Sequence, residues 1–231
     1  MKNIWMIWNY HILTYLNLKF IKNNMRDLRS LIVNDEYDQG GWCHDEKRNF
    51  IHTLVNLTLS KICIEIGVYK GSSLFSFAEV LEKNGGTIVG IDPWSYEMSK
   101  NELWDKDYEN YMYNELLKGQ ETFDKIYCNV CELIQNNGLS KTISVIKKPS
   151  QDAFIGFDIE SIDILHIDGN HNEMNVSRDI LLYLPLVKKN GYIIMDDSNW
   201  DGVNKGINKF LIPNCELVQD FGSFACYKKN K

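Results

Sequence analysis

Three aspartates directly follow two apolar runs that lie far apart in the chain. Asp168 comes after residues 162–167, and the pair Asp196-Asp197 comes after residues 192–195. If these runs form neighbouring strands about 4.8 Å apart, the three carboxylates converge on one small volume. Carboxylates that close repel one another unless a proton or a cation neutralises them. Because oxygen ligands without a nearby thiolate favour hard cations, we expect Mg²⁺, Mn²⁺ or Ca²⁺ between Asp168, Asp196 and Asp197.

The predicted metal site depends on a bend at the end of the second run. Adjacent residues of a straight strand point to opposite faces, so Asp196 and Asp197 can share one ion only where the chain turns. The following Ser198-Asn199 favours such a turn.

His171 follows Asp168 by three residues, on the loop above the same strand end. An imidazole there can accept a proton from a hydroxyl group held by the metal, because its ordinary pKa lies near neutral pH. The alternative is a solvent-exposed histidine at the entry to the next helix. The neighbouring aspartates favour the catalytic interpretation, with His171 as general base. His166 lies within the strand and is expected to be structural.

A glycine turn follows the first apolar run, residues 62–66. The motif reads Glu65-x-Gly67-x-Tyr69-x-Gly71-x-Ser73 and opens an amphipathic helix. A second apolar run, residues 87–91, ends at Asp92. In α/β sheets this arrangement binds an adenosine-bearing cofactor, with the turn beneath it and an acid for the ribose hydroxyls. The spacing is not Gly-x-Gly-x-x-Gly, which argues against a nicotinamide-dependent reductase.

Strands that alternate with helices must position these residues. Residues 143–146 predict one more strand, and helical spacing predicts helices at 45–59, 172–182 and 203–211. We therefore predict an α/β, Rossmann-like fold with a mostly parallel seven-stranded sheet and helices on both faces. Two short runs, 215–219 and 223–227, predict a C-terminal hairpin that adds one antiparallel strand.

Two further segments surround this sheet. Residues 1–40 form a predicted helical N-terminal extension to a single domain at 41–231, and residues 93–141 form a predicted helical insertion over the carboxyl ends of the strands. The aromatic residues of the insertion either line an acceptor pocket or pack the insertion itself. They are Trp94, Tyr96, Trp104, Tyr108, Tyr111 and Tyr113.

Composition restricts the partners. The chain has 231 residues and a formal net charge of −6, with no basic stripe, so we expect no nucleic-acid partner. Six scattered cysteines fit a reduced, cytoplasmic protein. Residues 3–18 carry no formal charge but are too polar for a transmembrane span. We expect this segment to pack on the domain or on a second subunit of a homo-oligomer, with peripheral membrane contact as the alternative.

The later motifs make a family resemblance specific. The Glu65-to-Ser73 motif resembles the first motif of class I S-adenosylmethionine-dependent methyltransferases. The later residues are the segment Leu165-His-Ile-Asp168-Gly-Asn-His171, with Asp179, Leu184-Pro185 and Gly191-Tyr-Ile-Ile-Met-Asp196-Asp197. Within that class they are most similar to the metal-dependent sugar and macrolide O-methyltransferases, the macrocin O-methyltransferase-like group, which is related to catechol O-methyltransferase. The resemblance extends from about Cys63 to Asp197.

The resemblance implies methyl transfer to a hydroxyl group of a sugar or a glycosylated small molecule. Asp168, Asp196 and Asp197 would then bind Mg²⁺, and His171 would be the general base where catechol O-methyltransferases place a lysine. The implied cofactor contacts are Glu65, Gly67, Tyr69, Gly71 and Ser73 around the methionine moiety, Asp92 at the ribose, Ser150 and Gln151 at the adenine, and Asp168 near the methionine ammonium.

Two alternatives stay open at this point. One is a metal-independent small-molecule methyltransferase, in which the acids only hold loop backbone. The other is a protein that binds S-adenosylmethionine without catalysis, as a regulatory or scaffolding subunit.

Overall fold

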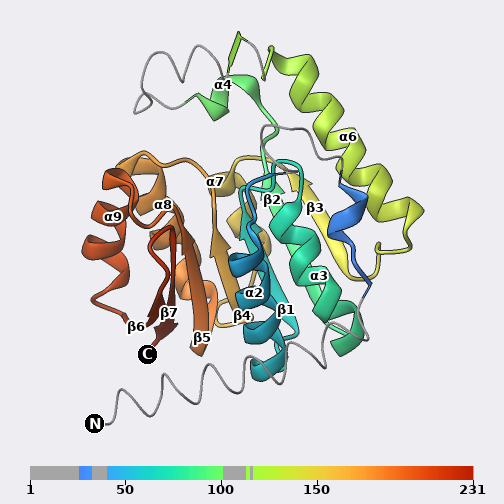
Figure 1. Cartoon of the computed structure of the whole chain (residues 1–231). Coiled ribbons are helices and arrows are strands. Elements are labelled where there is room, and N and C mark those ends of the chain that lie inside the picture. Colours follow the sequence, from blue (N-terminus) through green and yellow to red (C-terminus); the bar gives the residue numbers. More distant parts are fainter. Residues whose placement is uncertain (1–25, 33–40, 101–112, 115–116, 231) are drawn as a thin grey trace.

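The computed structural model describes residues 26–32, 41–100, 113–114 and 117–230. Within them one sheet of seven strands has the order β3-β2-β1-β4-β5-β7-β6 (Figure 1). The strands are β1 (Ile62–Ile66), β2 (Thr87–Asp92), β3 (Ile143–Lys147), β4 (Ile162–Ile167), β5 (Val187–Asp196), β6 (Cys215–Asp220) and β7 (Phe224–Lys229). The predicted N-terminal extension lies mostly outside the described residues.

The strand directions confirm the predicted sheet. The strands β1 to β5 pair in parallel, whereas β7 pairs antiparallel with both β5 and β6. The strand β7 is therefore the one strand that runs against all the others, as the C-terminal hairpin predicts. The strand order reverses between β1 and β4, which is where an open α/β sheet binds its ligand.

Helices cover both faces of the sheet (Figure 1). One face carries α2 (Asp45–Thr58), α3 (Ser72–Asn84) and α6 (Gln120–Asn136); the other carries α7 (Ser150–Ala153), α8 (Glu173–Tyr183) and α9 (Asp201–Gly206). Shorter helical turns are η1 (Arg29–Leu31), α4 (Tyr96–Ser99), η3 (Phe154–Gly156), η4 (Leu184–Leu186) and η5 (Ile207–Leu211). No helix among the described residues combines the length and the apolar composition that crossing a membrane requires.

The apolar strands explain this layering. Successive side chains of a strand point to opposite faces, so a strand covered on both sides must be apolar throughout. Cys63 of β1 and Ile164 of β4 pack in the core beneath α2 and α3, whereas Ile64 and Leu165 pack in the core beneath α8. The predicted start of β5 was wrong by several residues, because the strand begins at Val187 and includes the exposed, turn-like stretch that precedes the apolar run.

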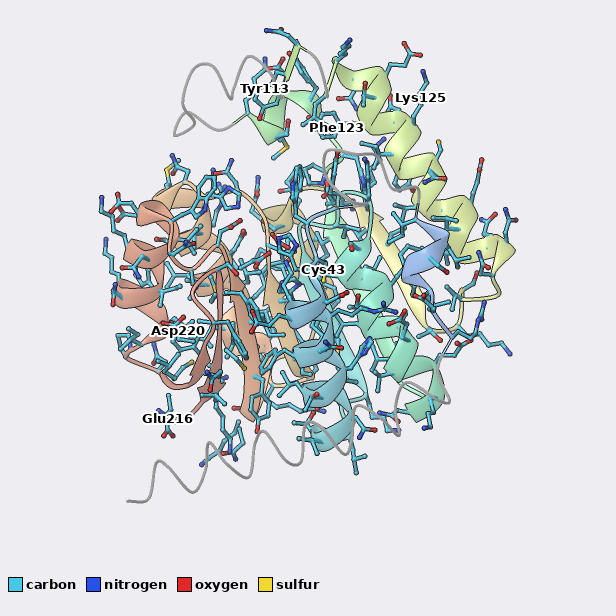
Figure 2. The ribbon with its side chains drawn as sticks, in the orientation of Figure 1. Cys43, Tyr113, Phe123, Lys125, Glu216 and Asp220 are labelled. Atoms are coloured by element: carbon cyan, nitrogen blue, oxygen red, sulfur yellow. The ribbon has the colours of Figure 1, made fainter. Side chains whose placement is uncertain are left out.

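The described part of the predicted insertion is helical, and its longest helix, α6, packs on one face of the sheet, with Val130 and Ile134 in the core. Trp94 is fully buried, and the rings of Tyr96 and Tyr113 meet edge to face at 5.7 Å. Tyr96 also contacts Phe123 of α6, and Figure 2 labels Phe123 and Tyr113. These aromatic residues therefore pack the insertion, whereas Trp104, Tyr108 and Tyr111 lie outside the described residues.

A buried charge network fixes α2 on α3. Glu79 of α3 is only 2% exposed and accepts hydrogen bonds from Arg48 of α2, at 3.1 Å from Nε and 2.5 Å from Nη2. The Nε2 atom of His52, one turn further along α2, lies 2.6 Å from the same carboxylate. The backbone N–H of Leu28 donates to it as well, at 2.8 Å. Because the carboxylate is fully partnered, the network sets the position of α2 over the sheet.

We expect Glu79→Ala to lower the free energy of unfolding by about 3 kcal/mol, because it leaves Arg48 and His52 without their buried partner. Urea denaturation followed by circular dichroism measures the change. The control is Glu82→Ala on the same helix, since Glu82 forms only an exposed pair with Arg26 at 3.0 Å and should cost about 1 kcal/mol or less. Equal losses for the two variants would contradict a structural role for the network.

Candidate active site

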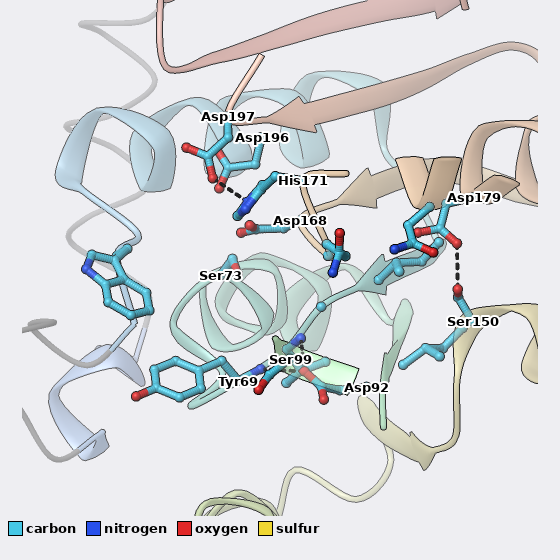
Figure 3. A pocket seen from close by; sticks show the side chains of 18 of the residues that line it. Tyr69, Ser73, Asp92, Ser99, Ser150, Asp168, His171, Asp179, Asp196 and Asp197 are labelled. Carbon is cyan, nitrogen blue, oxygen red and sulfur yellow. Dashed lines mark hydrogen bonds and ion pairs between the residues drawn. The ribbon is translucent and has the colours of Figure 1, made fainter. Parts of the chain in front are cut away.

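A cavity of about 460 Å³ opens at the carboxyl ends of the central strands. Ten of the twelve site residues predicted from the sequence line it: Gly67, Tyr69, Ser73, Asp92, Ser150, Gln151, Asp168, His171, Asp196 and Asp197. Figure 3 shows Asp168, Asp196, Asp197 and His171 at one side of the cavity. Asp92 and Tyr69 lie at a second side, and Ser150 and Asp179 at a third. Segments from distant parts of the sequence thus meet in one space.

Glu65 and Gly71 do not line the cavity, contrary to the expected contact with a cofactor. Glu65 is fully buried, because strand alternation turns it away from Ile64 and towards the core beneath α2 and α3. Its Oε1 atom lies 2.8 Å from Nδ1 of His166, the residue opposite it on β4. Gly71 instead shapes the start of α3, with a φ of +90°.

The glycine turn after β1 is set by a close backbone approach. Gly67 has a φ of +87°, and a Cβ atom placed there would lie 1.8 Å from the carbonyl oxygen of Asp168. The N–H of Asp168 donates to the carbonyl of Ile66 at 2.8 Å, which joins the ends of β1 and β4. Only glycine fits at position 67, and the turn lines the cavity.

Asp92 holds the next loop in place. Its carboxylate accepts hydrogen bonds from three backbone N–H groups, those of Val68, Tyr69 and Trp94, at 2.9, 3.0 and 2.6 Å. Burial raises the pKa of Asp92, and the three donors act in the opposite direction. The carboxylate is thereby fixed at the mouth of the glycine turn, where it also faces the cavity.

A lysine pairs with two of the three aspartates at the strand ends. The Nζ atom of Lys47, from α2, lies 3.3 Å from Oδ2 of Asp168 and also contacts Oδ2 of Asp196. Burial opposes the charge of Lys47, but the two carboxylates outweigh it and raise its pKa. Burial likewise acts to raise the pKa of Asp196, yet the Lys47 ammonium lowers it to about 2. For Asp168, burial and the charge of Asp196 raise the pKa well above its usual range.

Asp197 belongs to a different pair. Its φ of +46° provides the turn that the sequence predicts after β5, and the turn directs its carboxylate to His171. The distance from Oδ2 of Asp197 to Nε2 of His171 is 2.8 Å (Figure 3). The ring of Trp200 lies 4.5 Å from the imidazole, and Gly202 leaves room for the loop, because a Cβ there would lie 2.3 Å from the carbonyl oxygen of His171.

These contacts divide the ligands predicted for a divalent ion. Among the described residues, two sets of potential ligand atoms lie within 4.8 Å of one another: His166 with Asp168 and Asp196, and Asp168 with His171 and Asp197. Neither set contains both Asp196 and Asp197. Since Lys47 already holds Asp168 and Asp196, the predicted three-aspartate metal site does not fit the arrangement.

The remaining side of the cavity carries hydroxyl, amide and basic groups together with the Asp179 carboxyl. The Ser150 hydroxyl donates to Asp179 of α8 at 2.5 Å, and Arg178 lines the same wall. The Asn175 side chain, one turn earlier on α8, accepts a hydrogen bond from Arg178. This side offers hydrogen-bonding groups to a polar ligand.

Several of the residues that line the cavity were not predicted from the sequence. For Lys47, the sequence does contain a pattern that could have identified it. Lys47 precedes Phe50, Ile51 and Leu54 at helical spacing, so it lies on the apolar face of α2 where a lysine needs a buried partner. Trp42, which stacks on Tyr69 at 5.4 Å, had no comparable signal.

The sequence family described as "Methyltransferase domain" matches residues 64–198, more than half of the chain. The chain belongs to this family. No curated protein sequence matches the methyltransferase.

Solved structures share its fold at low sequence identity. The O-methyltransferase NovP has a TM-score of 0.65 at 14% identity, covering 84% of this chain and 83% of its own. TomG, an O-methyltransferase from Streptomyces achromogenes solved with SAM, has a TM-score of 0.60 at 13% identity over 94% and 96% of the two chains. The SAH-bound methyltransferase PaMTH1 from Podospora anserina has a TM-score of 0.57 at 12% identity over 94% and 88%.

Asp179 makes the stability of the methyltransferase depend on pH. Burial raises its pKa to about 6, against the hydrogen bond from Ser150. The folded state therefore binds the proton more tightly than the unfolded state, and stability falls as the pH rises from about 4 to 6. We expect Asp179→Asn to raise the free energy of unfolding at pH 7.5 by up to about 3 kcal/mol, with the gain vanishing near pH 4.

Urea unfolding of the ligand-free protein at the two pH values measures this effect. The exposed Asp158, changed to Asn, is the matched control and should alter stability little at either pH. A gain for Asp179→Asn that is the same at both pH values would show that the buried charge is not its source.

Proposed function

We propose that this methyltransferase transfers a methyl group from S-adenosylmethionine to a hydroxyl group of a small molecule. The observation that carries the proposal is the pairing of His171 with Asp197 in the same cavity as the Gly67 turn. A turn of this kind suits the cofactor, and a histidine beside a carboxylate suits proton removal from the acceptor. The O-methyltransferases among the structural neighbours are consistent with this assignment.

The cavity residues provide distinct contacts for the cofactor. The Gly67 turn admits the methionine moiety close to the backbone, and Tyr69 and Ser73 flank that position. Asp92, held by three backbone donors, would accept the ribose hydroxyls. Ser150 and Gln151 at the start of α7 would face the adenine, and Asp168 the methionine ammonium.

His171 is the proposed general base. Its Nε2 atom lies 2.8 Å from the Asp197 carboxylate, which puts a negative charge beside the ring that takes up the hydroxyl proton. The acceptor oxygen forms a bond to the methyl carbon while the carbon–sulfur bond breaks, its electron pair stays on sulfur, and the hydroxyl proton passes to His171. Asp197 then stabilises the imidazolium. Holding both reactants in line lowers the entropic part of the barrier.

We propose a sugar or a glycosylated small molecule as the acceptor. Asn170, Asn175 and Arg178 line the cavity on the side of His171 and α8, and such groups suit a ligand with many hydroxyls. The free state of all six cysteines, each within the described residues, supports a reducing compartment such as the cytoplasm. The divalent ion implied by the resemblance is not part of this proposal, because Lys47 holds two of its three expected ligands.

Calorimetry with S-adenosylhomocysteine tests the cofactor assignment, and label transfer from methyl-labelled S-adenosylmethionine tests the reaction. We expect the protein to bind S-adenosylhomocysteine and to label one of a panel of nucleotide sugars and glycosides more than simple phenols. His171→Ala should lower turnover by about 10²–10⁴-fold, because the proton then has no positioned acceptor. The affinity for S-adenosylhomocysteine should stay nearly unchanged.

Asp197→Asn separates the base from its partner. It keeps the shape of the side chain but removes its charge, so turnover should fall while His171→Ala remains the more severe change. Full turnover of His171→Ala would exclude the histidine as base. Absence of S-adenosylhomocysteine binding would refute the cofactor assignment, and binding without any transfer would indicate a non-catalytic cofactor-binding protein.

A further inference from the structure

We propose that the ammonium group of Lys47 is the resident cation of the acidic side of the cavity, where the resemblance implies a divalent metal ion. The part that Lys47 plays in catalysis rests on the proposed function. The position of its ammonium group does not, because it follows from the contacts with Asp168 and Asp196 whatever the methyl acceptor is.

Lys47 is built into the protein interior. Its side chain is 5% exposed, and its Nζ atom contacts carboxylates from the ends of two neighbouring strands, Asp168 after β4 and Asp196 at the end of β5. An ammonium group this buried requires such partners, because an unpaired charge there would be very costly. The Arg48 and His52 contacts with Glu79 anchor the same helix and keep Lys47 over the strand ends.

The geometry leaves a divalent ion without its expected ligands. Mg²⁺ requires near-octahedral oxygen ligands at about 2.0–2.1 Å. An ion bound to Asp168 and Asp196 would take the position of the Lys47 ammonium or lie in contact with it, and like charges at that distance repel strongly. The third expected ligand, Asp197, is paired with His171.

A lysine at this position supplies the positive charge that a metal ion would otherwise bring to the site. Its positive charge offsets the repulsion between Asp168 and Asp196 and fixes both side chains. It also places positive charge in the cavity in which the acceptor oxygen loses its proton. Lys47 is therefore a positioning residue, and the proposed methyl transfer proceeds without a metal ion.

Titration with Mn²⁺ alone, followed by the electron paramagnetic resonance of free Mn²⁺, tests the inference. The wild-type protein should bind no stoichiometric Mn²⁺ at millimolar concentration. Lys47→Met has a side chain of similar length without the charge, so it leaves Asp168 and Asp196 without their ammonium partner. We expect it to bind Mn²⁺ about a hundredfold more tightly than the wild type, which a merely structural lysine would not predict.

Three variants serve as controls. Lys47→Arg keeps the charge and should not gain Mn²⁺ binding. Lys229→Met removes another buried lysine, whose Nζ donates to the carbonyl of Val187 at 2.7 Å, and should not gain it either. In the double variant Lys47→Met with Asp196→Asn, the gain should be lost because a ligand is missing.

Stoichiometric Mn²⁺ binding by the wild type that Asp196→Asn abolishes would overturn the inference, and so would a folded Lys47→Met without any gain. If Lys47→Met does not fold, the wild-type and Lys47→Arg titrations still decide, because metal binding by either would overturn it and its absence in both supports it. Calorimetry with S-adenosylhomocysteine in parallel keeps this outcome distinct from a failure of the proposed function.

Discussion

The contact between the Gly67 turn and the end of β4 is the constraint on which the site depends. A carbonyl oxygen of Asp168 lies where a side chain on Gly67 would start, so the two strand ends can meet only if that residue is glycine. Their meeting places the Asp168 side chain beside the turn and leaves the cavity above both. Every other group that lines the cavity is positioned relative to these two strand ends.

Charge balance is the second constraint, and it comes from a helix outside the matched methyltransferase segment. Residues 64–198 contribute Asp168, Asp196 and Asp197, whereas the cation that pairs with two of them is on α2. The Glu79 network on α3 holds that helix in position. A domain built from the matched segment alone would gather the acids without neutralising them.

The sequence predicted the sheet and most of the cavity because both follow from local patterns. Apolar runs that end in a carboxylate put Asp92, Asp168 and Asp196 at strand ends, and parallel strands bring those ends together. The partners of the acids were not predictable in the same way. The φ of +46° at Asp197 turns its carboxylate towards His171, and Lys47 reaches Asp168 and Asp196 only through the packing of α2. Strand alternation with Ile64 indicates that Glu65 points into the core beneath α2 and α3. The prediction of a cofactor contact for Glu65 followed the motif resemblance instead.

The position of β7 in the sheet determines which strand edges are exposed before β7 has been synthesised. The strand β7 is inserted between β5 and β6, so β6 joins the described sheet only through β7, which follows it in the chain. A ribosome-bound nascent chain that lacks Phe224–Lys229 would therefore expose the bare edge of β5 and leave β6 without a neighbour. Loss of this strand would yield an aggregation-prone product with an open cavity wall, since Phe224 forms part of that wall.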